Sequence, residues 1–175
     1  MSNLLIEEVK LLALINPENV SKTEGESYPV REAARAVVID RQNMVALLHV
    51  VNQQYYKLPG GGIEKSEDKE TALKRECKEE IGSEIEIVSE IGCIVEYRKI
   101  FNLKQISYCY LAKLKGKKGV PSYTDEEMAN GFKQIWLPYD RTLDLISNNA
   151  ARNIEGRDYI VPRDLAFLKA AKQYL

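Results

Sequence analysis

Apolar residues recur along this chain in patterns typical of strands. Residues 33–40 (AARAVVID) end in a β-branched run, a short Arg-Gln-Asn turn follows, and residues 44–51 (MVALLHVV) resume the apolar run. Two apolar runs joined by a short turn predict a hairpin of buried strands. Apolar and polar residues alternate over segments 84–100 and 105–114, which predicts two long strands with a turn near Asn102.

Shorter strands and loops fill the rest of the pattern. Residues 55–62 (YYKLPGGG) predict a short strand that runs into glycine, and residues 133–138 (KQIWLP) predict another strand. The polar segments 16–30 and 115–132 are typical of loops, and the second is longer than a connection needs, as functional loops often are. The pattern of residues 4–15 fits a strand and a helix equally well.

The clearest helix spans about residues 69–81. Asp68 before it is a good N-cap, and Gly82 stands where a helix-ending glycine belongs. Two further helices are expected, from residue 139 or 140 to 147 and over residues 163–174.

These elements predict an α/β fold. Groups of strands flank a helix and a second helix closes the chain, which gives layers around a mixed sheet. The hairpin-like connections argue against a purely parallel sheet. The chain has 175 residues, no internal repeat and no linker, so we expect a single domain over residues 1–175.

Composition and charge narrow the classes of partner. Hydrophobic residues make up 45% of the chain and charged residues 29%, as in ordinary globular proteins. The net charge of -1 does not favour a nucleic acid partner, because duplex binding needs a broad basic surface. A small anionic substrate needs only a few local cations and remains compatible with this charge.

The N-terminal residues and the cysteines predict in which cellular compartment the protein is located. The apolar start carries Glu7 and Glu8 and lacks the features of a signal peptide. Runs of about 18 apolar residues, which a membrane span needs, are also missing. Cys77, Cys93 and Cys109 form no C-x-x-C pair, so we expect reduced, buried thiols in a cytoplasmic protein without a membrane partner.

The predicted helix concentrates negative charge on one side. On a wheel of about 100° per residue, Glu76, Glu79 and Glu80 share a face next to the apolar stripe, while Lys74 and Lys78 lie on the far side. Like charges at this spacing destabilise a helix. Because Mg²⁺ prefers carboxylate oxygens, the cluster predicts a divalent cation site. The alternative is a solvated acidic helix face.

Three glycines precede this helix. Gly60, Gly61 and Gly62 allow backbone conformations that other residues avoid and a close approach to a ligand. A glycine-rich loop ahead of a helix can also direct N–H groups at phosphate. The stretch therefore fits a site that holds both a cation and a phosphate.

The same stretch resembles a known motif. Gly61 is followed after five residues by Glu67 and after seven more by the run RECKEEIG, residues 75–82. This pattern resembles the Nudix box, the signature of the Nudix hydrolase family. Ser83 stands where the box has an aliphatic residue and Cys77 occupies another apolar position, but neither change removes an acidic residue.

The resemblance implies a fold and a reaction class. It implies an α/β/α sandwich around a mixed sheet, with a recognisable core over about residues 31–150. Family members hydrolyse a nucleoside diphosphate linked to another group, with Mg²⁺ or Mn²⁺ and an attacking water. By position, Glu76, Glu79 and Glu80 would be metal ligands, joined by the backbone carbonyl of Gly60.

The resemblance also implies catalytic roles. Glu67 and Arg75 would form a pair that braces the loop against the helix. Glu76 and Glu80 count as catalytic as well as metal-binding residues, and Glu76 is a candidate base for the attacking water. In other family members a later loop supplies the base, and Glu127, at the end of the DEE run, is the candidate here. That run could instead simply begin a solvated helical turn.

Substrate contacts are expected from cations near the glycines. Arg31, Arg35 and Lys57 lie on strands that lead to the site, and we expect them, with Gly61, to bind phosphate. Arg35 is the strongest choice because it interrupts an apolar run, and Arg98 is a further cation. Aromatic residues that could stack on a base, but more often belong to a core, are Tyr55, Tyr56, Tyr97 and Phe101. His49, alone on an apolar strand, is expected to be structural.

Several functions compete within the resemblance. We expect a nucleoside triphosphate pyrophosphohydrolase of the nucleotide-sanitation type, because the short tags of the ADP-ribose, dinucleoside polyphosphate and coenzyme A groups are missing. ADP-ribose, sugar nucleotides and dinucleoside polyphosphates remain alternatives, as does a non-catalytic module that senses a nucleotide. The acidic chain gives an RNA cap-removing role little support. Family members are often dimers, so a homodimer is compatible with the resemblance.

Overall fold

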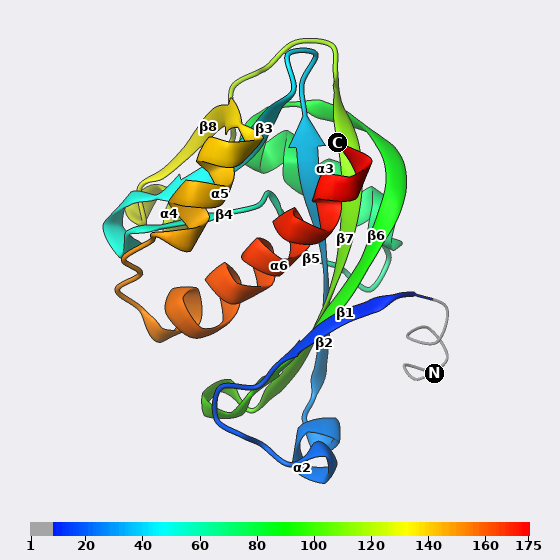
Figure 1. The fold of residues 1–175 in the computed structure, drawn as a ribbon, viewed down its shortest axis with the longest axis vertical. Coiled ribbons are helices and arrows are strands. Elements are labelled where there is room, and N and C mark those ends of the chain that lie inside the picture. Colours follow the sequence, from blue (N-terminus) through cyan, green and yellow to red (C-terminus); the bar gives the residue numbers. More distant parts are fainter. Residues whose placement is uncertain (1–8) are drawn as a thin grey trace.

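The computed structural model describes residues 9–175 and is built on a twisted mixed sheet (Figure 1). Its strands are β1 (Leu11–Ile15), β2 (Val30–Ile39), β3 (Met44–Val50), β4 (Tyr55–Lys57), β5 (Gly60–Gly62), β6 (Glu84–Arg98), β7 (Leu103–Lys115) and β8 (Phe132–Pro138). Within the described range the strands pair in the order β1-β6-β7-β2-β3-β4, and β5 joins β2 while β8 joins β3. The β1–β6 and β2–β7 pairs are parallel and the others antiparallel, so the expected mixed sheet is confirmed.

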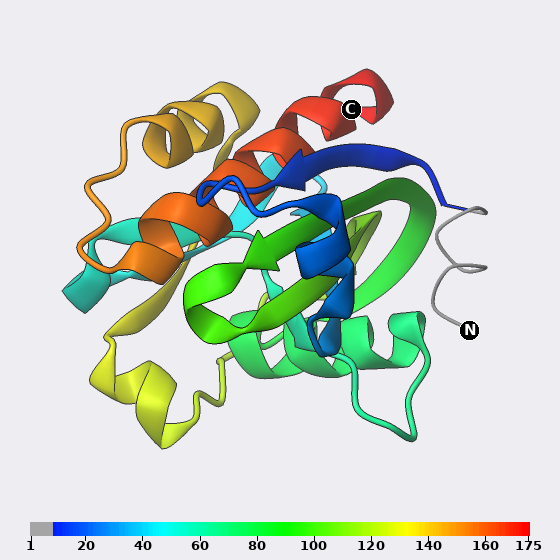
Figure 2. The same cartoon turned by 90° about the horizontal axis from the view of Figure 1, so that it is seen from below.

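Helices cover both faces of the sheet. Figure 2 shows α3 (Lys69–Ile81) on one side, and α5 (Tyr139–Ser147) with α6 (Val161–Ala171) on the other. Two separate cores result, because alternate residues of β2 point to opposite faces. Ala36 packs in the core under α3, and Val37 packs in the core under α5 and α6. The expected α/β/α sandwich is confirmed.

Strands β2 and β3 form the predicted hairpin, but they separate close to its turn. β2 and β3 are antiparallel, but they pair only next to their turn, at Ile39 and Val45. Further along, the glycine strand β5 takes the place of β3, and Arg35 pairs with Gly60. On its other edge β2 pairs with β7 over ten residues, from Val30 to Ile39. The glycines are thus fixed to the central strand of the sheet.

Helix α3 has the ends that its sequence predicts. The Asp68 side chain accepts a hydrogen bond from the backbone N–H of Thr71 at 2.7 Å. Gly82 ends the helix with φ of 60°, a left-handed conformation that favours glycine. The helix buries Leu73, Cys77 and Ile81 against the sheet, as the apolar stripe requires.

Other parts differ from the predicted pattern. The two predicted loops contain short helices, α2 (Lys22–Ser27) and α4 (Asp125–Ala129). Both begin at hydroxyl side chains, Ser21 and Thr124, which accept a backbone hydrogen bond as N-caps do. The last helix is predicted over residues 163–174, but its turns begin earlier, with a π-helical segment (Gly156–Ile160) that leads into α6.

Three smaller predictions can also be compared with the described residues. The ambiguous N-terminal segment forms a strand over Leu11–Ile15, and its residues 4–8 lie outside the described part. Cys77, Cys93 and Cys109 are buried free thiols, as expected. Among residues 9–175, every helix is too short or too polar to cross a membrane.

The end of α3 should be sensitive to any side chain at residue 82. A methyl group on Gly82 would lie 2.5 Å from the backbone of Val120, besides the unfavourable φ. We expect Gly82→Ala to lower the unfolding free energy by roughly 2–4 kcal/mol in urea denaturation. Gly116→Ala is the control, because its φ is 79° but a methyl group there would meet no described atom within 4 Å. That variant should lose only about 1 kcal/mol. Equal losses would contradict the close contact.

Candidate active site

The glycine strand β5 brings the backbone of residues 60–62 between β2 and the C-terminal half of α3. Gly60 has φ of 132°, and a methyl group on it would lie 2.1 Å from the carbonyl oxygen of Ala34. At Gly61 a methyl group would lie 2.3 Å from the carboxylate of Glu76. Gly60 therefore excludes a side chain, because backbone atoms of the sheet stand in the way, whereas a side chain at Gly61 would displace the carboxylate of Glu76.

Glu80 is the innermost acid of the site. Its carboxylate is fully buried, and its two oxygens accept hydrogen bonds from Lys57 Nζ at 2.8 Å and from the Gly60 N–H at 2.7 Å. Burial raises the pKa of Glu80, and the charge of Lys57 opposes that shift. Three segments of the chain therefore meet at one carboxylate.

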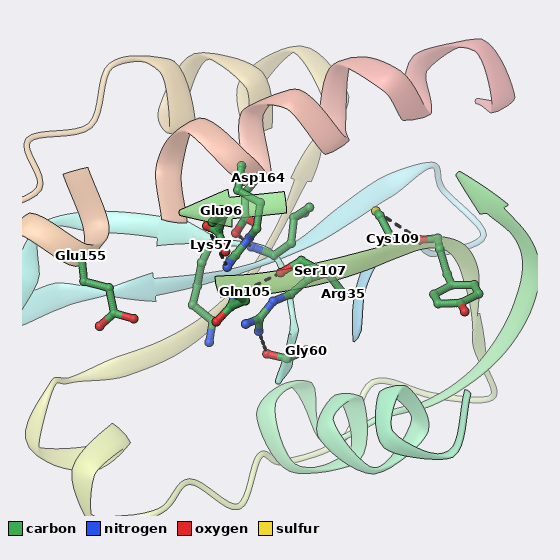
Figure 3. A network of polar contacts seen from close by, with 12 residues as sticks. Arg35, Lys57, Gly60, Glu96, Gln105, Ser107, Cys109, Glu155 and Asp164 are labelled. Atoms are coloured by element: carbon green, nitrogen blue, oxygen red, sulfur yellow. Dashed lines mark hydrogen bonds and ion pairs between the residues drawn. The ribbon is translucent and has the colours of Figure 1, made fainter. Parts of the chain in front are cut away.

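Arg35 completes the surroundings of Gly60. Figure 3 shows the Arg35 guanidinium reaching the carbonyl oxygen of Gly60, to which its Nη1 donates a hydrogen bond. Burial, together with the nearby charge of Arg163, lowers the pKa of Arg35 to about 10. The side chain remains a cation at neutral pH. The carbonyl that the resemblance implies as a metal ligand thus already accepts one hydrogen bond.

Arg75 gathers the acids on the outer side of the helix. It donates to both carboxylate oxygens of Glu67, at 2.6 and 2.9 Å, and to the Gly62 carbonyl at 3.1 Å. Its Nη1 also lies 2.7 Å from Glu76 and 3.6 Å from Glu79. These bonds, led by those to Glu67, raise the pKa of Arg75. The Glu67–Arg75 pair therefore joins the loop to α3 in the place that the sequence suggested.

The three helix acids differ in exposure. Glu80 is buried, Glu76 is largely buried, and the Glu79 side chain is 42% exposed. Partial burial and then the charge of Glu76 raise the pKa of Glu79, and Glu127 adds to the shift. The charge of these acids is thus only partly neutralised by the cations around them.

A hard divalent cation fits this donor set. All three groups are carboxylates, which Mg²⁺ prefers, and their unneutralised charge favours a cation. Within residues 9–175 the carboxylates do not gather as a preformed cluster of three or more ligands. Glu80 instead contacts Lys57 and Gly60, and Glu76 contacts Arg75.

A cleft of about 370 Å³ opens over these residues. Seven residues predicted for the substrate or the metal line it: Arg31, Arg35, Lys57, Gly60, Gly61, Glu76 and Glu80. The glycines 60–62 form part of its floor, whereas Glu67, Arg75 and Glu79 lie outside the lining. One cleft therefore combines an acidic group, Glu76 and Glu80, with a basic group, Arg31, Arg35 and Lys57.

Arg31 is the member of the basic group most available to bind an anion. Its Nη1 donates to the amide oxygen of Gln105 at 2.7 Å, which is a neutral partner. Burial, and next the charge of Arg98, lowers its pKa. Arg98 itself does not line the cleft, because Glu96 and Glu155 hold it at 3.2 and 2.8 Å.

Glu127 reaches the cleft from α4, in the segment that the sequence predicts as a long loop. It lines the cleft, and its Oε2 accepts the backbone N–H of Thr124 at 2.8 Å in a capping box. Both interpretations of the DEE run thus meet in one residue, which begins a helical turn and also faces the cleft.

Part of the cleft lining lacks any signal in the sequence. Asn153, Glu155 and Ile160 come from the segment before α6, Gln53 ends a 3-10 turn after β3, and Thr124 and Asn130 cap α4. Of the aromatic candidates, Tyr55 lines the cleft, Tyr97 is in the core, and Phe101 packs edge-on against Tyr159. His49 stacks on Tyr56 at 4.3 Å, outside the cleft lining.

Breaking the buried Lys57–Glu80 ion pair should lower the unfolding free energy much more than breaking a surface ion pair would. In metal-free buffer, Lys57→Met would leave the buried Glu80 carboxylate without its cation and should lower the unfolding free energy by roughly 3 kcal/mol. The double variant Lys57→Met/Glu80→Gln removes both charges and should recover most of that loss. Urea denaturation of the two variants gives the comparison. A double variant no more stable than Lys57→Met would contradict the pairing.

Sequence comparisons connect this geometry to known proteins. The family profile described as NUDIX domain matches residues 29–158. An RNA pyrophosphohydrolase of Pelagibacter ubique is 30% identical over 80 residues, which cover 44% of this chain and 51% of that protein. An RNA pyrophosphohydrolase of a Nitratiruptor species is 36% identical over 93 residues, covering 48% and 59%. The chain thus spans about half the length of these curated relatives.

Solved structures share the fold at low identity. The E. coli ORF135 protein superposes with a TM-score of 0.59 and 17% identity, over 83% of this chain and 90% of that one. The MutT protein of Methanosarcina mazei Go1 gives a TM-score of 0.51 at 15% identity, covering 67% and 83%. Because the family profile matches about three quarters of the sequence, and these structures share its fold, the chain belongs to the Nudix hydrolase family.

Proposed function

We propose that this Nudix hydrolase cleaves a phosphoanhydride bond of a nucleoside triphosphate, with water, to give a nucleoside monophosphate and pyrophosphate. The observation that carries the proposal is the charge arrangement of the cleft, in which Arg31, Arg35 and Lys57 lie beside Glu76 and Glu80. Three cations suit a chain of phosphates, and carboxylates suit the divalent cation that accompanies them.

The carboxylates of Glu76, Glu79 and Glu80, with the carbonyl of Gly60, would hold Mg²⁺ or Mn²⁺. When bound, a divalent cation neutralises negative charge on phosphate oxygens. Arg35 already donates to the Gly60 carbonyl, and the Gly60 N–H donates to Glu80. These two bonds keep the glycine backbone in one orientation, whereas Glu76 and Glu80, which contact Arg75 and Lys57, would have to turn toward the cation on binding.

Each side chain then has a defined task. Arg31, Arg35 and Lys57 bind and orient the phosphates, and the Gly61 backbone contributes at close range. Arg75 does not face the substrate but holds Glu67 and Glu76 in place. Proton abstraction from the attacking water needs a carboxylate at the cleft, which Glu76 provides from α3 and Glu127 from α4.

A second candidate substrate is the 5′-triphosphate end of RNA. Both curated relatives carry the name RNA pyrophosphohydrolase, and their matches cover close to half of this chain. The reacting group is the same triphosphate, so the same cleft residues would serve. The net charge of -1 favours the free nucleotide, because long RNA contacts need additional basic surface.

Glutamine substitutions should show by their effect on kcat which acids of α3 take part in the reaction and which do not. Glu79→Gln and Glu80→Gln should each lower kcat roughly 100-fold or more with Mg²⁺ present, because a charged ligand is lost. The matched control is Glu70→Gln on the same helix, whose side chain is 57% exposed and pairs only loosely with Lys74. It should retain wild-type turnover. Circular dichroism checks that the variants are folded, and full activity in both site variants would refute the metal assignment.

A substrate panel should distinguish the candidate reactions. Free nucleoside triphosphates, a 5′-triphosphorylated oligoribonucleotide and ADP-ribose are compared with Mg²⁺ and Mn²⁺, and pyrophosphate and phosphate are assayed separately. We expect kcat/KM for a free nucleotide to exceed that of the oligoribonucleotide by roughly tenfold or more, with release of pyrophosphate. The opposite order would favour the RNA substrate, and a preference for ADP-ribose would contradict both candidates.

A further inference from the structure

The C-terminal helix α6 contacts the backbone of the cleft directly. Asp164, fully buried on α6, accepts a hydrogen bond from the Leu58 backbone N–H through its Oδ2 at 2.8 Å. Figure 3 shows Asp164 on the side of the sheet away from α3. The family profile ends at residue 158, so this contact comes from outside the matched region.

The contacted residue lies at a critical place in the chain. Leu58 and Pro59 connect β4 to β5, and proline has no N–H, so Leu58 supplies the only backbone donor of this link. Before the link, the Lys57 side chain donates a hydrogen bond to Glu80. After the link, the Gly60 N–H donates to Glu80, and the Gly60 carbonyl accepts from Arg35. A shift of Leu58 would therefore displace both contacts of Glu80.

Asp164 is itself held in a defined orientation. The Nε of Arg163 donates to its Oδ1 at 2.7 Å, which leaves Oδ2 directed at Leu58. Arg163 Nη1 lies 4.0 Å from Glu96, which accepts from Arg98, and Arg98 reaches Glu155 in the cleft lining. These charges thus form a series from Asp164, at the Leu58 backbone, to Glu155 in the cleft lining.

A buried ion pair of this kind is a poor way to stabilise a helix. Apolar residues of similar volume often stabilise a core as well or better, because two charges lose their hydration. α6 already has apolar contacts for that purpose, through Phe167 and Leu168. The Arg163–Asp164 pair is better explained by its hydrogen bond to the Leu58 backbone, which it holds in place.

We propose that Asp164, oriented by Arg163, is a positioning residue that fixes the Lys57–Gly60 segment of the cleft. Its effect on catalysis rests on the function proposed above, whereas its effect on the segment does not. The structural alternative is that the pair only attaches α6 to the sheet. The two differ in which amide becomes exposed when the pair is removed.

The test measures hydrogen exchange of the Leu58 amide by NMR, in the full chain without metal or nucleotide. Asp164→Ala should accelerate this exchange at least tenfold, while amides of the β6–β7 pair keep their rates. The double variant Arg163→Met/Asp164→Ala avoids an unpaired buried charge and should show the same acceleration if the single variant does not fold. Tyr139→Phe is the matched control, since it removes a different hydrogen bond to α6, to the Leu168 carbonyl.

Kinetics with the best nucleotide complete the test. Asp164→Ala, or the double variant in its place, should lower kcat roughly 10- to 100-fold with a smaller change in KM, as loss of a positioning contact does. Arg163→Met/Asp164→Asn keeps one carbonyl oxygen as an acceptor for Leu58, without a competing arginine, and should restore both slow exchange and most of kcat relative to Arg163→Met/Asp164→Ala. Tyr139→Phe should match wild type in both.

Three results would overturn the proposal. The first is wild-type exchange at Leu58 in the folded alanine variants, and the second is the same acceleration in Tyr139→Phe. The third is Arg163→Met/Asp164→Asn behaving like Arg163→Met/Asp164→Ala in exchange and kcat. A wild-type chain that hydrolyses no nucleotide would refute the proposed function, while the exchange rates would still decide the role of Asp164.

Discussion

The peptide group of Gly60 is the point on which the cleft depends. Its N–H binds the buried carboxylate of Glu80, its carbonyl accepts from Arg35, and the Ala34 carbonyl leaves no room for a side chain on it. The central strand, the acidic helix and the glycine strand are therefore connected through one residue. Because both polar groups of this residue are satisfied by charged partners in a buried place, its orientation is strongly determined. The orientation of Gly60 also helps to place Lys57, which comes shortly before the glycines in the chain, and Glu76, whose carboxylate lies against Gly61.

The sequence predicted those parts of this arrangement that depend on local signals. Asp68, the apolar stripe and Gly82 are sufficient to place α3, and the spacing from Gly61 to Gly82 is sufficient to suggest the family. A helical wheel puts Glu76, Glu79 and Glu80 on one face but cannot show that Glu80 is buried and Glu79 exposed. That difference is set by Lys57 and Gly60, which reach the helix only in the folded sheet. The short helix at Lys22 was missed because polar, turn-rich composition outweighed its capping residue, Ser21, whereas a helical turn at Asp125 was one of two open alternatives.

The part of the cleft built by the C-terminal segment shows a different limit. Glu155 and Asp164 lie in a segment without a motif, and their roles arise from contacts with residues more than fifty positions away, at Arg98 and Leu58. Only the paired topology of the sheet brings these residues together. Arg31 and Arg35 were predictable as cations on a strand that leads to the glycines, yet their neutral and backbone partners were not. Local chemistry thus identifies the reaction class, and tertiary contacts form the surface that would discriminate substrates.

The long parallel pair at the centre of the sheet has a consequence for biosynthesis. β2 pairs with β7 over residues 30–39 and 104–113, so the strand that holds the glycines has no long neighbour until residues 104–113 have left the ribosome. Contacts of such sequence separation form slowly, because the intervening loop must close first. Until then the apolar residues of β2 and β3 are exposed to non-native pairing. The cleft, which also needs residues 153–164, therefore forms only after these residues have been synthesised.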